Sequence, residues 1–350
     1  MKPANVTTSV RHHSAGRFFF CLVLTALLAS CAKPLPTVLE GEAQGTYYRI
    51  CYYDERDLQP QVDSLLHAFD LSASLWVDSS LLRRVNANLT DSLDATLATL
   101  LAHSLYINDY VGGAFDCRVG RIVQVWGFSF RERSEPDSAA LAALLDAARA
   151  PVALSVPADS VGWAIHKSNP ATELDFNAIA QGYSVDLLAA MMDSLGVENY
   201  LIDVGGEVIA RGNKADGSPW RIGIERPAAD RYDAPTVQSV IALHDASVVT
   251  SGSYRKFYER DGVRYSHTID PATGRPVQHS LLSVSVAEKE CWLADAMATA
   301  YMVMGLDRSL SFIADHPGQP GTAAVMFIYD SCGTMKTYTT QVFDDLIVSQ

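Results

Sequence analysis

Apolar residues recur at helical spacing in several segments of the chain. The expected helices cover residues 58–69, 93–111, 137–150, 177–195 and 292–305. Gly112 and Gly196 directly follow two of these segments, and a glycine at that position allows the turn that commonly ends a helix. Asp137 stands near the start of a third, where its side chain can cap unpaired N–H groups.

Shorter segments alternate apolar and polar residues between turn residues, as strands do. The expected strands lie within residues 38–53, 152–165, 200–204, 207–210, 220–224, 240–243, 247–249, 281–286 and 323–329. The first of them reads as a hairpin, broken at Gln44, Gly45 and Thr46. Because hairpins and separate helices are intermingled, the predicted fold class is α+β, with mixed sheets in two lobes and packed helices.

Composition narrows the class of protein. The chain has 350 residues, of which 48% are hydrophobic and 19% charged, so a sizeable core is expected. The formal net charge of −13 argues against a non-specific nucleic-acid binder, which needs a basic face. A phosphate-bearing ligand would need a metal, a basic side chain or backbone N–H groups.

The N-terminus has the features of an export signal. A basic region is followed by an apolar run, residues 18–28, and by small residues immediately before Cys31. This order predicts a lipoprotein signal peptide at residues 1–30, a lipidated Cys31 with a short tether at 31–36, and one domain at 37–350. The protein is then an exported bacterial lipoprotein, anchored to a membrane and facing the periplasm. The alternative is an ordinary secretory signal with an incidental cysteine.

Cys51, Cys117, Cys291 and Cys332 remain in the expected domain. They are far apart and show no zinc-binding spacing. We expect buried, small apolar side chains at these positions.

The stretch from residue 250 to 277 is rich in hydroxyl, carboxylate and imidazole side chains and in turn residues. Asp261 and Gly262 predict a tight turn, and the residues after it alternate as on one strand, with His267 between hydroxyl and carboxylate neighbours. Asp270 and Pro271 then turn the chain. An imidazole in such a place is suited to take a proton near neutral pH. The alternative is a surface hairpin with an incidental histidine.

Asp295 and Thr299 lie four residues apart in an expected helix, so their oxygens share one face. A carboxylate and a hydroxyl among small alanines suit a hard cation such as Mg²⁺. Alternatively, the helix packs closely on a sheet and Thr299 bonds to its own backbone.

Asp175 and Asn177 precede another expected helix, where unpaired N–H groups could hold a phosphate. Equally, either residue could be the N-cap. The chain contains no P-loop, dinucleotide-binding glycine motif, HExxH or GxSxG. The absence of these motifs argues against an ordinary nucleotide-binding protein, a metalloprotease and a serine hydrolase.

Taken in order, a series of short motifs resembles one family, the FAD:protein FMN transferases, also called ApbE-like. The matching segments are Gly45-Thr46, Gly113-Ala114-Phe115-Asp116, Trp126-Gly127-Phe128, Asp175-x-x-Ala178-Ile179-Ala180-x-Gly182-Tyr183-x-x-Asp186, Val204-Gly205-Gly206-Glu207, Thr250-Ser251-Gly252, His267-x-Ile269-Asp270-Pro271-x-Thr273-Gly274 and Ala294-Asp295-Ala296-x-Ala298-Thr299-Ala300. They span residues 45 to 305, nearly the whole expected domain, and the implied fold is that of the ApbE-like flavin transferases.

The resemblance implies a role for each matched position. Asp295, Thr299 and the backbone carbonyl of Ala178 would hold Mg²⁺, and His267 would be the catalytic base. The FAD site would include Gln44, Trp76, Ala114, Phe115, Asp116, Asp175, Gln181 and Ile269.

Three positions depart from the family pattern. Gln44 stands where a methionine is usual, Gln181 replaces a lysine and so removes one positive charge, and Trp76 stands where a tyrosine is frequent.

The implied reaction is Mg²⁺-dependent transfer of FMN from FAD to a Ser or Thr hydroxyl of an exported acceptor protein, with release of AMP. The implied acceptors are flavoprotein subunits of electron-transfer complexes. Two alternatives stay open: an Mg²⁺-dependent FAD pyrophosphatase, which the loss of the lysine at 181 would favour, and a non-catalytic flavin-binding lipoprotein.

Overall fold

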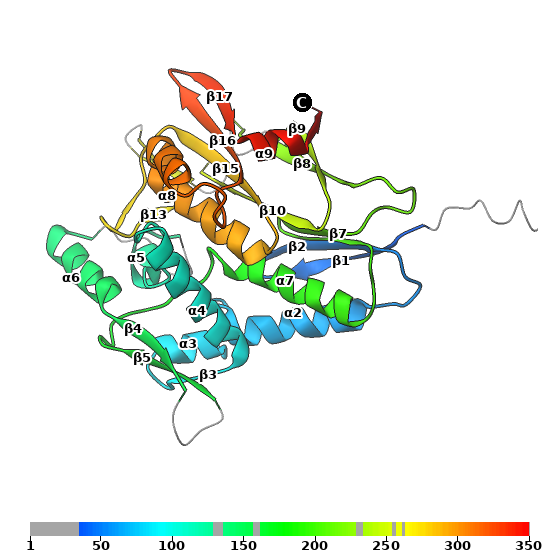
Figure 1. Ribbon diagram of the computed structural model, residues 1–350. Helices are drawn as coiled ribbons and strands as arrows, with labels where there is room; N and C mark the ends of the chain where they lie inside the picture. The colour runs from blue at the N-terminus through cyan, green and yellow to red at the C-terminus, as the bar shows by residue number, and fades with distance from the viewer. Residues whose placement is uncertain are drawn as a thin grey trace, which may run out of the picture. The chain divides into compact units, whose positions relative to one another are not determined.

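The computed structural model describes residues 35–128, 136–156, 162–228, 234–253, 257–260 and 263–349, with the backbone alone for residues 257–260 and 263–265. The expected signal peptide, Cys31 and the expected turn at Asp261 and Gly262 lie outside these residues. Residues from Pro36 onward group into one unit, whose elements are shown in Figure 1.

The largest sheet of the described residues has eight strands in the order β1-β2-β6-β7-β10-β15-β16-β17. Its strands are β1 (Thr37–Ala43), β2 (Thr46–Tyr52), β6 (Tyr200–Val204), β7 (Glu207–Arg211), β10 (Ala246–Gly252), β15 (Leu281–Glu288), β16 (Ala324–Ser331) and β17 (Thr334–Thr339). Every pair of neighbours in it is antiparallel. The sheet is therefore antiparallel rather than mixed. β1–β2, β6–β7 and β16–β17 are hairpins, and the other neighbouring strands are joined by longer connections, such as α8 between β15 and β16.

Smaller sheets and two isolated hairpins account for the other strands, again all antiparallel. They are β18-β9-β8 (Ile347–Ser349, Thr236–Leu243, Trp220–Arg226), β3-β5-β4 (Ser92–Leu93, Trp163–Lys167, Val152–Ser155), β11-β12 (Phe257–Arg260, Val263–Ser266) and β13-β14 (Ile269–Asp270, Arg275–Pro276).

The helices are α2 (Gln59–Ala73), α3 (Leu81–Asn86), α4 (Ala95–Tyr110), α5 (Gly120–Val125), α6 (Ser138–Arg149), α7 (Ala180–Ser194), α8 (Cys291–Asp315) and α9 (Gln341–Leu346). α2, α7 and α8 cover one face of the large sheet, whereas α9 packs on the opposite face. α8 packs on β10 and β15, α7 packs beside α8, and α2 lies next to α7 (Figure 1).

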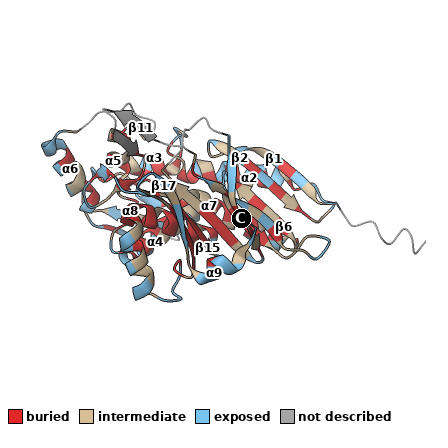
Figure 2. Ribbon diagram, turned by 90° about the horizontal axis from the view of Figure 1, so that it is seen from above, coloured by how far each residue is buried: buried red, intermediate tan, exposed pale blue. Residues whose placement is uncertain are grey.

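The central strands of the large sheet are buried on both faces. In β16, Val325 and Phe327 belong to the core under the helices, whereas Met326 and Ile328 belong to a second core shared with β8, β9 and α9. Successive side chains of a strand point to opposite faces, so a strand covered on both sides needs a continuous apolar run. The buried residues drawn red in Figure 2 accordingly include both α8 and the strands beneath it.

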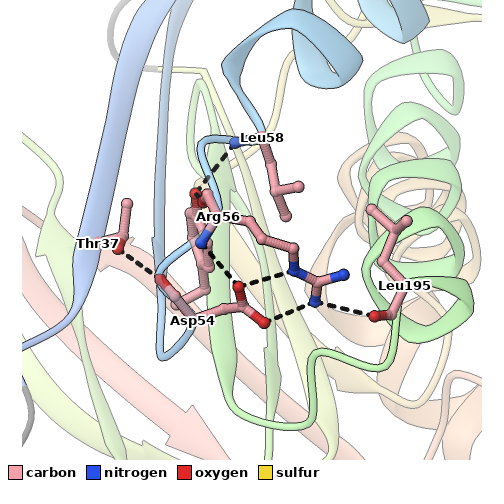
Figure 3. Close-up of polar contacts among 6 residues, drawn as sticks. Thr37, Asp54, Arg56, Leu58 and Leu195 are labelled. Atoms are coloured by element: carbon pink, nitrogen blue, oxygen red, sulfur yellow. Dashed lines mark hydrogen bonds and ion pairs between the residues drawn. The ribbon is translucent and has the colours of Figure 1, made fainter.

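The C-terminal end of α7 is fixed by the loop that follows β2. At its C-terminal end, Arg56 donates a hydrogen bond to the carbonyl of Leu195 (2.9 Å), while its guanidinium also pairs with Asp54 (Figure 3). A cation suits this end of a helix, where the last carbonyls have no partner within the helix. Thr37 in turn donates to the Asp54 carbonyl (2.7 Å), which ties β1 to the same loop.

The predicted α+β class is confirmed, and several element boundaries differ from the prediction. α7 begins at Ala180 rather than at residue 177, and neither Asp175 nor Asn177 is its N-cap, because Ile179 holds that position. α8 does not end at Gly305: the helix breaks there and continues to Asp315. Cys117 and Cys291 are buried as expected, whereas Cys332 is exposed.

In the part of the chain that the structure describes, no helix combines the length and apolar character that crossing a bilayer requires.

Candidate active site

The first turn of α7 is irregular. Ala180 N makes the regular helical bond to the Phe176 carbonyl, but Ile179 N donates to the same oxygen, and the next regular bond among the described residues runs from Tyr183 N to the Ile179 carbonyl. The N–H of Gly182 would ordinarily bond to the carbonyl of Ala178, four residues earlier. It donates instead to Asp295 Oδ2 on α8, at 3.0 Å. Among the described residues, no donor takes its place on the Ala178 carbonyl, so this oxygen is left for a ligand.

Gly182 allows α8 to come this close. A Cβ at position 182 would lie 2.6 Å from the carbonyl oxygen of Cys291 and 2.8 Å from the Cβ of Asp295. Any larger residue would therefore push the two helices apart, and the carboxylate of Asp295 would leave the first turn of α7.

Asp295 is almost fully buried, with 4% of its surface exposed. Burial raises the pKa of its carboxyl well above the ordinary value, and the nearby Asp186 raises it further, while the Gly182 N–H bond opposes both. A bound cation would stabilise the ionised form of this buried carboxylate, because it replaces the stabilisation that the charge lost on leaving water.

Thr299 follows Asp295 by one turn of α8, as its spacing predicted. Its hydroxyl lies 3.4 Å from the hydroxyl of Ser251, near the end of β10. The chain leaves the large sheet just beyond Ser251 and returns at β15, where Gly252 faces Ser283. The segment between these two residues carries His267, and it begins directly after Ser251, the residue that contacts Thr299.

Gln181 joins α7 to two turns of the large sheet. Its side-chain N–H donates to the carbonyl of Val204 at 2.8 Å. A Cβ on the next residue, Gly205, would meet this Gln181 nitrogen and also Thr46 of the β1–β2 hairpin. Gln44 occupies that same hairpin turn in a left-handed conformation, with φ of 55°, as the predicted break requires.

Asp175 joins the start of α7 to the segment that contains Asp116. Its backbone N–H donates to the carbonyl of Cys117 at 2.7 Å, and its Oδ1 accepts from Asn177 N at 2.8 Å. Asp116 is held by Arg118, whose guanidinium donates to both of its carboxylate oxygens at 2.8 Å. The resemblance placed both acids in an FAD site, and the structure places their segments side by side.

Three other expected FAD-site residues have buried side chains: Ala114, Phe115 and Ile269. Phe115 packs in the main core, and Ile269 packs with Trp126 in a smaller cluster. They could therefore meet a ligand mainly through their backbone. Trp76 differs from them, since 61% of its surface is exposed on the loop after α2.

His267 does not lie on one continuous strand with Ile269, as the alternation predicted. β12 ends at Ser266, β13 begins at Ile269, and His267 falls in the break between them. The Ser266 hydroxyl accepts from Thr268 N at 3.1 Å, which turns the chain at this point. The His267 ring is half-buried and lies edge-on to Phe128, with ring centroids 6.4 Å apart. The Trp126 indole, two residues before Phe128, donates to the Gly274 carbonyl at 2.8 Å and so ties this region to the turn after β13.

The oxygen atoms around the start of α7 fit a hard cation. The Ala178 carbonyl has lost its helical donor, the Asp295 carboxylate lies against the same turn, and the Thr299 hydroxyl is one turn further along α8. Oxygen ligands of this kind are those that Mg²⁺ and Ca²⁺ prefer. The described residues contain no cluster of three or more His, Cys, Asp or Glu side chains that could hold a metal ion. Of the three residues proposed here, only Asp295 belongs to these residue types.

Two buried polar atoms at expected FAD positions also lack a partner. Asp175 Oδ2 and Gln44 Nε2 are inaccessible to solvent and have no hydrogen bond within the described part of the chain. Burying a polar group without a partner is costly, so such atoms often mark where a ligand binds. The hydroxyl groups and ring nitrogens of a dinucleotide are suitable partners for an acceptor and a donor.

Two residues at the site were part of the sequence motifs but received no role from the sequence. Ser251 contacts Thr299, and Asp186 accepts hydrogen bonds from the first turn of α8. The available signal for Asp186 was its place at the end of the motif that begins at Asp175.

Comparisons with known proteins identify the family of the chain. The family model described as the ApbE family matches residues 44–326. A Vibrio cholerae relative named FAD:protein FMN transferase is 37% identical, covering 91% of this chain and 95% of the relative. A Salmonella typhimurium relative of the same name is 33% identical, covering 94% of this chain and 97% of the relative.

Solved structures give the same result. The flavin transferase ApbE from Vibrio cholerae matches with a TM-score of 0.75 and 31% identity, covering 89% of this chain and 99% of that one. The apo form of the flavinyl transferase ApbE from Pseudomonas stutzeri matches with a TM-score of 0.76 and 31% identity, covering 90% and 98%. The chain therefore belongs to the ApbE family.

Proposed function

We propose that this protein is an Mg²⁺-dependent FAD:protein FMN transferase, which moves FMN from FAD to a Ser or Thr hydroxyl of an exported acceptor protein and releases AMP. The observation that carries the proposal is the diversion of the Gly182 N–H to Asp295, which leaves the Ala178 carbonyl beside a buried carboxylate. The names of the curated relatives support the same activity.

The chain's own residues divide the work as follows. The Ala178 carbonyl, the Asp295 carboxylate and the Thr299 hydroxyl would hold Mg²⁺, and a bound Mg²⁺ would neutralise negative charge on the FAD pyrophosphate. Asp175 and Gln44 offer one acceptor and one donor to the dinucleotide. His267 takes the proton of the acceptor hydroxyl, whose oxygen then forms a bond to the FMN phosphorus as the bond to AMP breaks.

Replacing His267 and Asp295 separately tests this division. His267→Ala should keep FAD binding and lose about 10²–10⁴-fold in transfer rate, since that is the usual contribution of a positioned base. Asp295→Ala should lose activity together with the response to Mg²⁺. His166→Ala, an exposed histidine on β5, is the matched control and should transfer FMN normally. Full transfer by His267→Ala would refute its role as the base.

The acceptor is identified by its product. We infer that the acceptors are exported subunits or domains of electron-transfer complexes. Co-expression with a candidate acceptor, followed by intact-mass measurement, should show one added FMN that disappears when the target Ser or Thr is replaced by Ala. If none of the candidate acceptor proteins gains the mass of FMN, the result would count against protein flavinylation.

An FAD pyrophosphatase is the second candidate, and Gln181 favours it. This neutral side chain is fixed to the Val204 carbonyl, at the position where the family pattern has a lysine. With less positive charge near the phosphates, water could replace the acceptor hydroxyl and give FMN and AMP. Steady AMP release from FAD and Mg²⁺ without acceptor would indicate hydrolysis, whereas acceptor-dependent AMP release supports transfer. FAD binding without turnover under either condition would leave a flavin-binding lipoprotein.

We also propose that the protein is exported as a lipoprotein, with Cys31 lipidated and the folded unit in the periplasm. The support is the order of basic, apolar and small residues before Cys31.

A further inference from the structure

The first turn of α8 is capped by a side chain from another helix. Asp186 on α7 accepts from Cys291 N through Oδ1 and from Trp292 N through Oδ2, each at 2.8 Å. These are the first two residues of α8, whose N–H groups have no partner within the helix. The residue that precedes the helix, Glu290, makes no side-chain capping bond, so Asp186 supplies the cap from α7.

Asp295 makes the reciprocal bond, from α8 back to α7. Its Oδ2 accepts from Gly182 N in the first turn of α7, at 3.0 Å. In each helix the donor and the carboxylate are about one turn apart: Gly182 and Asp186 on α7, Cys291 and Asp295 on α8. The two helices touch between these bonds, where a Cβ on Gly182 would lie 2.6 Å from the Cys291 carbonyl oxygen.

Two carboxylates that bond in opposite directions, one turn apart, fix more than the distance between the helices. A single bond would let α8 rotate about its own axis or slide along α7. Because Asp186 is hydrogen-bonded to the first turn of α8 and Asp295 to the first turn of α7, either movement would break at least one of these bonds. The direction in which the Asp295 side chain leaves α8 is thereby set.

We propose that Asp186 is a positioning residue for the cation site, holding α8 in the rotation that places the Asp295 carboxylate against the Ala178 carbonyl. Asp186 itself does not touch the cation. The inference rests on the Mg²⁺ site of the proposed function. Partners that orient metal ligands in this way typically change metal affinity 10–100-fold when they are removed.

The test measures cation binding as well as activity. Mn²⁺, which prefers the same oxygen ligands as Mg²⁺, is titrated into the protein with FAD present and acceptor absent, and unbound Mn²⁺ is counted by electron paramagnetic resonance. Asp186→Ala should bind Mn²⁺ about 10–100-fold more weakly than the wild type. Asp186→Asn keeps one side-chain oxygen as an acceptor, so its affinity should fall between the two. Hydrogen exchange at the amides of residues 291 and 292 should be faster in both variants.

Asp193→Ala is the matched control. Asp193 also lies on α7 and accepts a hydrogen bond, from the Tyr200 hydroxyl at 2.7 Å, but this bond is to β6 and not to α8. Loss of this bond should lower the melting temperature. It should leave the Mn²⁺ affinity within about twofold of the wild type, because Asp193 shares no bonding partner with the cation site.

The outcomes separate this inference from the proposed function. If Asp186→Ala or the milder Asp186→Asn melts earlier but binds Mn²⁺ as tightly as the wild type, Asp186 is only a helix cap and the positioning role is overturned. Asp295→Ala, titrated alongside, tests the site itself. If that variant binds Mn²⁺ like the wild type, both the cation site and the role of Asp186 fail; if it alone loses binding, only the role of Asp186 fails.

Discussion

At the scale of single residues, Asp175 links the candidate site to the pH dependence of stability. Burial raises the pKa of its carboxyl from 3.8 to about 6, and the bond from Asn177 only partly opposes this. Between these two pH values the folded protein keeps a proton that the unfolded chain has released, so stability falls as pH rises through this window. At ~1.4 kcal/mol per pKa unit the whole effect amounts to roughly 3 kcal/mol.

Asp175→Asn should remove this contribution. In the absence of FAD and metal, the free energy of unfolding of the wild type should drop between pH 4 and pH 7 by more than that of the variant, by roughly 3 kcal/mol at most. Urea unfolding at the two pH values measures the difference. Equal changes in both proteins would mean that the Asp175 carboxyl has an ordinary pKa in the folded state.

The residues of the candidate site could be named from the sequence only in part. The spacing of Asp295 and Thr299 was enough to place both on one face of a helix, because that relation is local. The Ala178 carbonyl was implied by the family resemblance but not by local spacing, because this oxygen is available only if the Gly182 N–H bonds elsewhere. That direction is set by packing of α8 on α7, which local spacing does not encode.

At the scale of elements, α8 is two helical segments joined at Gly305. This residue has φ of 72° and ψ of 174°, a conformation that is essentially restricted to glycine. His279 lies directly beside it: a Cβ at position 305 would be 3.1 Å from the imidazole Cδ2, and the ring nitrogen Nε2 lies 2.8 Å from the Met302 carbonyl at the end of the first segment. The break is therefore part of the packing, and the sequence pattern, which ended the helix at Gly305, identified the residue but not the continuation.

Gly305→Ala should destabilise the protein by about 1–3 kcal/mol for the backbone alone, with a further loss from the crowding against His279. Gly333→Ala is the matched control, since Gly333 also has a left-handed φ, of 80°, but a Cβ there meets nothing within 4 Å. We expect the control to cost about 1–2 kcal/mol, the strain of a left-handed residue without a clash. Chemical denaturation compares the two, and equal losses would show that His279 moves aside without cost.

The same contrast explains which boundaries were predicted. Gly112 and Gly196 end their helices with left-handed φ values of 59° and 75°, as the sequence indicated, because a glycine stop is a local signal. The late start of α7 and the break at His267 were not predicted. Both depend on hydrogen bonds that replace the regular pattern, from Gly182 N to the Asp295 carboxylate and from Thr268 N to the Ser266 hydroxyl.

At the scale of the whole molecule, the α+β class followed from the mixture of hairpins and helices, but the layering did not. The second core lies between the large sheet and the β18-β9-β8 sheet, and it includes Phe343 of α9. β18 and α9 were not recognised in the sequence, since each is too short to show a periodic pattern.

Membrane attachment is the remaining property of the whole molecule, and it depends on Cys31 in our proposal. The folded unit begins at Pro36, and the formal net charge of −13 gives the protein no general attraction to anionic lipid surfaces. Acyl chains on Cys31 would then supply most of the membrane affinity. In a host that processes lipoproteins, replacing residues 1–31 by an ordinary cleavable secretory signal should move the protein from the membrane pellet to the soluble fraction while FMN transfer per folded molecule stays the same, because the replaced residues lie before the folded unit. Fractionation of both proteins with a transfer assay on each fraction measures this, and a variant that still sediments with membranes would show that another part of the chain provides the attachment.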